Sequence, residues 1–125
     1  MEKKHRLVAL LLLLLLVACG PTDNYGYPSK INFGKEGGTK ICSGRIIVSS
    51  ISINDYNGNG IAELTKDEND TIITKYYWLT VKFKRLVGHE IKIIAEPNTT
   101  GKKRTLYVYG SIYNDDATIK VTQDK

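Results

Sequence analysis

Apolar and polar residues alternate along most of the chain after about residue 30. The clearest run is 76–84, whose odd-numbered positions from Tyr77 to Phe83 are apolar while Thr and Lys residues dominate the positions between them. An alternation with a period of two places one face of a β-strand in a core and the other in solvent. The run therefore predicts one half-buried strand, with Tyr77 on the core face and Trp78 on the polar face.

Other short runs of the same kind are separated by turn residues, and none keeps an apolar period of 3.6 residues. β-Branched and aromatic residues dominate them, as they do in strands. The stretch 54–71 is polar and predicts a long loop. So many short strands within roughly 95 residues are typical of an all-β, immunoglobulin-like β-sandwich, with an isolated β-barrel as the alternative. About seven strands are expected, over 31–33, 39–43, 45–54, 76–84, 90–95, 104–109 and 118–123.

A different pattern occupies the N-terminus. Lys3, Lys4 and Arg6 precede an unbroken apolar run, Leu7–Val17, which is followed by a small residue and then Cys19. As a helix at about 1.5 Å per residue the run is roughly 16 Å long, too short for a bilayer core of about 30 Å. A basic start, a short apolar centre and a small residue before the cleavage point describe a secretory signal.

The last four residues of this segment, ending at Cys19, resemble the bacterial lipobox. The resemblance implies cleavage before Cys19 and attachment of palmitate-type chains to it. Each buried methylene contributes about 0.8 kcal/mol, so two or more chains anchor a protein stably. We expect a lipoprotein of the cell envelope, at the outer membrane rather than the inner. The chain then divides into a signal peptide over 1–18, a lipidated tether over 19–30 and one domain over 31–125.

The balance of charge changes once the signal is removed. The full chain has a formal net charge of +5, and loss of residues 1–18 leaves +3. So mild a balance does not indicate a nucleic-acid partner. With Cys19 acylated, Cys42 has no cysteine to pair with, and its apolar neighbours predict a small buried residue. His89 falls in a predicted exposed turn.

Further landmarks follow one another in order along the domain. Phe33 precedes a Gly-Gly-Thr turn, Trp78 opens a Trp-Leu-Thr-Val segment, an asparagine-rich turn leads from Asn98 to Arg104, and Thr-Gln closes the domain at Gln123. In this order the landmarks resemble the BACON family, β-sandwich domains of Bacteroidetes surface proteins.

The resemblance covers residues 31–123. It implies an immunoglobulin-like fold, a buried Trp78, and a role in binding glycans or mucin or in spacing other parts of a protein. The segment Arg45-Ile46-Ile47 departs from the family, which has a tryptophan near this point.

The polar stretch contains the start of a calcium-binding loop pattern, D-x-N-x-N-G. Asp55, Asn57 and Asn59 stand at its first, third and fifth positions, and Glu63 at its ninth. In such loops side-chain oxygens converge on the cation. The twelfth position is Lys66 instead of a carboxylate, and its charge opposes the metal. Ca²⁺ is therefore the one cofactor that the sequence suggests, against the alternative of a polar turn whose Asn-Gly pairs adopt positive φ.

Aromatic side chains offer a second kind of site. Alternation places Tyr107 and Tyr109 on a polar strand face, and it does the same for Tyr76 and Trp78. Flat rings stack on sugar rings, and a phenol hydroxyl can hydrogen-bond to them. The four residues are thus a candidate glycan-binding platform, although tyrosine also simply favours strands.

The sequence gives little indication of a catalytic site. Ser49, Ser50 and Ser52 have no base near them, and the acidic residues of 67–70 fall on a polar loop. We therefore expect a non-catalytic, lipid-anchored envelope protein that binds or displays glycans, with envelope proteins as other partners. The alternatives are a structural or assembly subunit, a spacer, and a calcium-stabilised adhesion module. Residues 70–72 also resemble the O-glycosylation signal of Bacteroidetes, which implies a glycan on Thr71.

Overall fold

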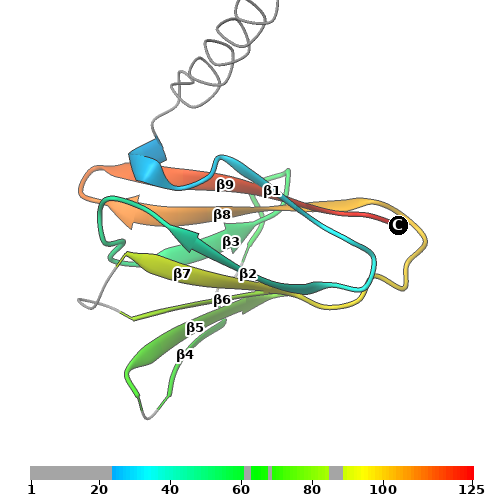
Figure 1. The fold of residues 1–125 in the computed structure, drawn as a ribbon, viewed down its shortest axis with the longest axis horizontal. Coiled ribbons are helices and arrows are strands. Elements are labelled where there is room, and N and C mark those ends of the chain that lie inside the picture. The colour runs from blue at the N-terminus through cyan, green and yellow to red at the C-terminus, as the bar shows by residue number, and fades with distance from the viewer. Residues whose placement is uncertain (1–23, 61–62, 68, 85–88) are drawn as a thin grey trace, which may run out of the picture.

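Two β-sheets pack face to face in the computed structural model, which describes residues 24–60, 63–67, 69–84 and 89–125, and only the backbone of Glu63 (Figure 1). The four-stranded sheet has the order β1-β9-β8-β3, and the five-stranded sheet the order β2-β7-β6-β5-β4. The predicted all-β sandwich is confirmed. The signal peptide and Cys19 lie outside the described residues.

The strands β1 and β9 run parallel, and every other neighbouring pair is antiparallel. A short 3₁₀ turn, η1, precedes β1. In the ranges that the structure describes, no helix is long and apolar enough to cross a bilayer. The elements are η1 (Asn24–Gly26), β1 (Lys30–Phe33), β2 (Gly38–Ser43), β3 (Ile51–Asn54), β4 (Glu63–Lys66), β5 (Thr71–Tyr76), β6 (Leu79–Lys84), β7 (Glu90–Ala95), β8 (Arg104–Ile112) and β9 (Asp115–Gln123).

Alternation along the central strands builds the core. On β6, Leu79 and Val81 face the core and are fully buried, while Lys82, on the outer face, is half-buried. β8 follows the same rule, with Leu106 and Val108 inward, so the two sheets bring apolar faces together. Burying one such side chain contributes about 1.5–3 kcal/mol. Cys42 is buried, as predicted.

The segment 76–84 is two strands joined by a turn instead of one strand. The chain reverses at Tyr77 and Trp78 between β5 and β6, and Tyr77 has a positive φ of 51°. Tyr77 is 72% exposed, so its predicted core position is wrong. Trp78 is 7% exposed and belongs to the core, as the family resemblance implies and alternation does not. A turn inside the run resets the phase of the alternation.

Two other boundaries differ from their predictions. The expected loop over 54–71 contains β4, because Glu63–Lys66 pairs with β5 as a hairpin. The expected strand over 45–54 keeps only Ile51–Asn54, because the residues before it carry the chain from the five-stranded sheet to the four-stranded one. Nine strands therefore stand in the described ranges where about seven were expected.

Part of the segment predicted as a tether, 19–30, packs on the sandwich. The Asn24 side chain donates to the carbonyl oxygen of Thr118 at 2.9 Å and accepts from its N–H at 2.9 Å. Tyr27 is 4% exposed, and its hydroxyl donates to the carbonyl oxygen of Ile46 at 2.7 Å. Residues 24–30 accordingly belong to the folded domain and not to a tether.

Candidate ligand-binding groove

A row of lysine and isoleucine side chains crosses the outer face of the five-stranded sheet. The strand register places Lys82 on β6 directly opposite Lys92 on β7. Ile41 of β2 lies opposite Lys92, and Ile73 of β5 lies opposite Lys82. Residues directly opposite on antiparallel strands have Cβ atoms about 5 Å apart, and like charges there are unfavourable. The register therefore places two side chains of like charge next to each other at the centre of this face.

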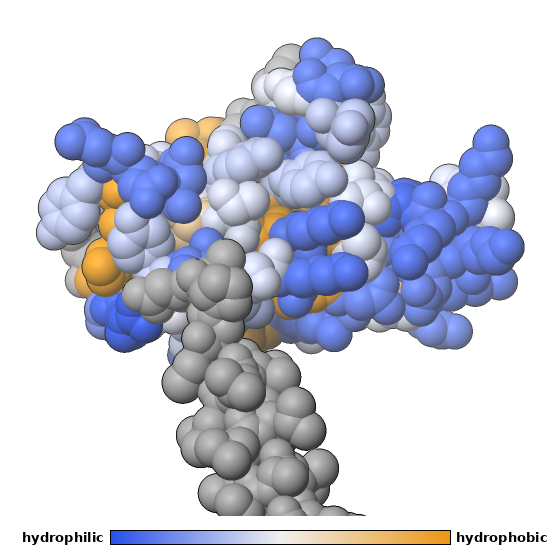
Figure 2. Space-filling model, turned by 90° about the horizontal axis from the view of Figure 1, so that it is seen from above, coloured by the Kyte–Doolittle hydropathy of each residue, from blue (hydrophilic) through white to orange (hydrophobic). Residues whose placement is uncertain are grey.

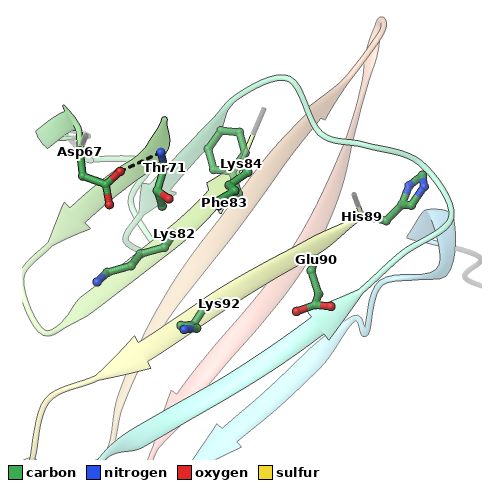
Figure 3. Close-up of a pocket in the computed structure, with 8 residues that line it drawn as sticks. All are labelled: Asp67, Thr71, Lys82, Phe83, Lys84, His89, Glu90 and Lys92. Carbon is green, nitrogen blue, oxygen red and sulfur yellow. Dashed lines mark hydrogen bonds between the residues drawn. The ribbon is translucent and has the colours of Figure 1, made fainter. Parts of the chain in front are cut away.

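A groove of about 450 Å³ lies over these two lysines (Figure 3). It is bounded by Asp67 on the turn between β4 and β5 and by His89 and Glu90 where β7 begins. His89 is exposed, as predicted. Among the described residues of the lining, three ammonium groups stand against two carboxylates, an excess of positive charge. The described lining residues are Asp67, Thr71, Lys82, Phe83, Lys84, His89, Glu90 and Lys92.

The carboxylate of Asp67 is fixed by its own turn. Its Oδ1 accepts hydrogen bonds from the backbone N–H groups of Asn69 at 2.9 Å and Thr71 at 3.0 Å, the second of which is drawn in Figure 3. These two bonds, that from Thr71 above all, lower the pKa of Asp67, and the charge of Lys82 acts in the same direction. A carboxylate with a lowered pKa stays ionised and can accept hydrogen bonds from ligand hydroxyl groups.

Thr71, the predicted O-glycosylation residue, begins β5 and lines this groove. It is half-buried, and its N–H is engaged by Asp67. A sugar attached to the Thr71 hydroxyl would occupy the groove itself, so modification and ligand binding there would compete.

The four aromatic residues of the predicted platform lie on different surfaces. Tyr107 and Tyr109 share the outer face of the four-stranded sheet, where they lie opposite Lys120 and Thr118 of β9. That sheet is at the top in Figure 1, so it is turned toward the viewer in Figure 2, which is seen from above. Tyr76 belongs to the other sheet and packs partly against the core, with its ring centroid 4.5 Å from that of its exposed neighbour in the β5–β6 turn.

Trp78 is the fourth member of the platform, and its ring is covered by a guanidinium group. The Arg104 guanidinium carbon lies 4.7 Å from the ring centroid, which is a cation–π contact. The Arg104 Nε–H donates to the Gln123 side chain at 2.8 Å, and Gln123 donates to the carbonyl oxygen of Glu96 at 2.7 Å. Because β9 carries Gln123 and Glu96 follows β7, this chain of contacts joins the two sheets.

Asn98 extends this network beside the last residues of the chain. It is 1% exposed. Its amide donates to the carbonyl oxygens of Lys102 at 2.8 Å and Asp124 at 2.9 Å, and its oxygen accepts from the Thr100 hydroxyl at 2.7 Å. We call the end of the sandwich that holds Trp78, Asn98, Arg104 and Gln123 the network end. The residues that carry the BACON resemblance thus hold the sheets together.

The residues of the calcium-loop pattern form a turn between β3 and β4. The Asp55 Oδ1 accepts from the backbone N–H groups of Asn57 and Asn59, both at 2.9 Å. Lys66, at the twelfth position, forms an ion pair with Asp70 at 2.9 Å. Glu63 begins β4, and its side chain lies outside the described residues. Within the described ranges, no three His, Cys, Asp or Glu residues are grouped as a metal site.

The lysine row was not found from the sequence. Alternation does place Lys82 on a polar face, but its partner Lys92 is ten residues further along the chain. Only the β6–β7 register brings the two together. Register depends on how two strands pair, so no local pattern could have indicated this pair.

Comparison with known proteins supports the fold alone. No family model matches the chain, and no curated protein matches it. The solved structures include one described as "NMR structure of the protein from Bacteroides thetaiotaomicron", with 20% sequence identity and a TM-score of 0.55. The match covers 78% of this chain and 81% of the other. A likeness at this identity means that the two chains share a sandwich architecture.

Proposed function

We propose that the chain is a lipid-anchored, non-catalytic module of the cell envelope that binds acidic glycans in the groove over β6 and β7. One observation carries the proposal: Lys82 and Lys92 lie opposite one another in a groove. The ion pairs between side chains of the described residues involve other lysines, Lys66 and Lys75. A carboxylate or sulfate group bound between the two ammonium groups would relieve their repulsion.

The surroundings of the lysine pair suit a sugar. The carboxylates of Asp67 and Glu90, which line the groove, can accept hydrogen bonds from hydroxyl groups. Apolar Ile41 and Ile73 are not part of the lining but flank the lysine pair on the same face, where a sugar ring could rest. Binding sites of this kind combine apolar contact area with a few placed polar groups.

The proposed location rests on the N-terminal pattern. The basic start, the apolar run over 7–17 and the lipobox-like residues before Cys19 support export and lipidation. A BACON-like domain of Bacteroidetes type at the outer membrane agrees with the order of landmarks from Phe33 to Gln123.

Affinity electrophoresis of the full-length lipidated chain in detergent tests the groove. Gels containing chondroitin sulfate or polygalacturonate should retard the protein, and gels containing dextran should not. Changing Lys82→Gln and Lys92→Gln together should weaken the retardation about tenfold, equivalent to about 1.4 kcal/mol. Added salt should weaken binding as well, because the groove is open to solvent.

A matched control exists on the other sheet. Lys30 of β1 and Lys120 of β9 also lie opposite one another and are exposed, and neither lines the groove. Changing Lys30→Gln and Lys120→Gln removes the same charge without touching the groove and should leave retardation nearly unchanged. Equal losses in the two double variants, or no retardation in either acidic gel, would contradict the proposal.

An assembly subunit is the second candidate, and exposed apolar residues on edge strands favour it. Leu64 on β4 is 61% exposed and Ile41 on β2 is 59% exposed, and both strands end the five-stranded sheet. Open edges of this kind can pair with another chain. Analytical ultracentrifugation should show a monomer if the glycan proposal holds. A concentration-dependent oligomer that Leu64→Lys dissolves would favour assembly.

A further inference from the structure

The chain enters the sandwich at one end. The carbonyl oxygen of Tyr25 accepts the N–H of Arg45 at 2.7 Å, and the Tyr25 hydroxyl donates to the carboxylate of Asp115. Asp115 follows the turn between β8 and β9, whose first residue is Tyr113. We call this end, made up of Asn24–Gly26, residues 45–49 and the β8–β9 turn, the anchor end. Figure 1 shows η1 beside the β8–β9 turn, at the opposite end from the C-terminus.

The anchor end carries apolar and aromatic side chains around a hollow of about 580 Å³. Arg45, Ile46, Ile47, His89, Ile112 and Tyr113 are among the residues that line it. Tyr113 is 91% exposed, and Ile46 and Ile47 are only half-buried. Figure 2 shows apolar atoms exposed at this end, on the left, while the opposite end is hydrophilic.

The length of the remaining tether limits how far this end can be from a membrane. Asn24, the first described residue, comes five positions after the proposed lipidated Cys19, with four residues between them. An extended chain of that length spans at most about 18 Å. The polar headgroup layer takes up roughly 5–8 Å of this. The network end lies a further strand length away, about 30 Å for the nine residues of β8.

We propose that the anchor end rests on the lipid surface, with Tyr113 and the rim formed by Ile46 and Ile47 in the interfacial region. The inference rests on the proposed lipid anchor at Cys19. Tyrosine is enriched at membrane interfaces because its ring is apolar and its hydroxyl is polar. The short tether holds the anchor end close to the headgroups, so contact requires little additional ordering of the chain. In this orientation the network end faces away from the membrane.

Two tyrosines make a matched pair of reporters. Tyr113 and Tyr77 each begin a two-residue turn, with φ values of 53° and 51°, and both are exposed, but they lie at opposite ends of the sandwich. The full-length lipidated chain carrying Tyr113→Trp or Tyr77→Trp is reconstituted into phosphatidylethanolamine and phosphatidylglycerol vesicles that contain a lipid brominated on its acyl chains. Bromine quenches tryptophan emission at close range, and Trp78 contributes the same background to both variants.

The emission added by Tyr113→Trp should fall at least about twofold on bromination, as expected for an interfacial ring, while that added by Tyr77→Trp should not change. Asn114→Trp, in the same turn, repeats the measurement if Tyr113→Trp does not fold. Flotation of the vesicles tests the lipid anchor separately from the contact between the anchor end and the membrane. A chain that floats without selective quenching at the anchor end overturns this inference and leaves the lipid anchor standing. A chain that does not float overturns both.

Discussion

At the network end, Asn98, Arg104 and Gln123 are buried or half-buried and form hydrogen bonds that link the ends of several strands. At the anchor end, the hydroxyl of Tyr25 donates to the carboxylate of Asp115, which is exposed. A buried polar group left without its partner costs about 1–3 kcal/mol, whereas an exposed one can bond to water. The two ends should therefore respond very differently to the loss of a side chain.

The contrast between the two ends also distinguishes residues that stabilise the fold from residues of the proposed function. The asparagine-rich turn and the closing Thr-Gln, which carry the family resemblance, belong to the network end and connect the sheets. The lysine groove and the proposed membrane contact involve other residues, on β6, β7 and the anchor end. Resemblance at the network end is thus informative about the sandwich and uninformative about the ligand.

The largest expected effect comes from a pair of asparagines, one at each end. Asn98→Ala removes a side chain that bonds to two carbonyl oxygens and one hydroxyl. We expect it to lower the free energy of unfolding by about 3 kcal/mol. Asn114→Ala, in the exposed β8–β9 turn, should change the free energy by less than about 0.5 kcal/mol. Urea denaturation followed by circular dichroism measures both, and similar losses would remove the contrast between the ends.

A smaller effect is expected for Tyr27, a buried residue that follows the first segment of the anchor end and bonds to Ile46 in the second. Tyr27→Phe removes its bond to the carbonyl oxygen of Ile46 and should cost about 1 kcal/mol at neutral pH. Burial raises the pKa of the Tyr27 hydroxyl above its ordinary value of 10.0. The unfolded chain therefore loses this proton first, and stability falls as the pH rises from 10.0 toward the raised pKa. Tyr27→Phe should reduce this loss of stability at alkaline pH, which melting temperatures measured at a series of pH values would show. If the loss is unchanged in the variant, other tyrosines cause it.

Acid should loosen the anchor end before the network end. The bond from Tyr25, followed by the N–H of Asp116, lowers the pKa of Asp115 below 3.8. A lowered pKa stabilises the fold above 3.8, and this contribution is lost as the pH falls through the folded-state value. Hydrogen exchange corrected for intrinsic rates should show reduced protection of the Arg45 N–H in acid, with the Asn98 N–H still protected. Asp115→Asn should abolish the difference; if it persists, another group is responsible.

The smallest expected effect is that of calcium. Asp55 and Asp67 form the same turn, in which one carboxylate oxygen accepts N–H groups two and four residues later. Only the Asp55 turn fits the calcium pattern, and one oxygen of its carboxylate already accepts two backbone N–H groups. We expect melting temperatures in excess Ca²⁺ and in chelator to agree within about 1 °C. A calcium-dependent rise that Asp55→Asn abolishes and Asp67→Asn preserves would instead establish a calcium-stabilised module.

Turn chemistry explains where the sequence-based predictions failed. Tyr77 has positive φ, a conformation that usually indicates glycine, asparagine or aspartate. With tyrosine and tryptophan in the turn, the hairpin could not be recognised, and Tyr77 was assigned to the core. The strand β4 was missed for a related reason, because its short run is bounded by polar turns and gains its pairing only from β5.

The sequence by itself determined the class of fold and much of the core. A period of two between turn residues specifies half-buried strands, and the inward positions of β7, β8 and β9, such as Ile93, Val108 and Val121, can be read from it directly. Only the tertiary structure decided which surfaces those strands create. The opposition of Lys82 and Lys92, the covering of Trp78 by Arg104, and the closeness of Tyr113 to the entering chain all depend on strand register and on which sheet each strand joins. These are long-range choices fixed by packing, and the local pattern does not encode them.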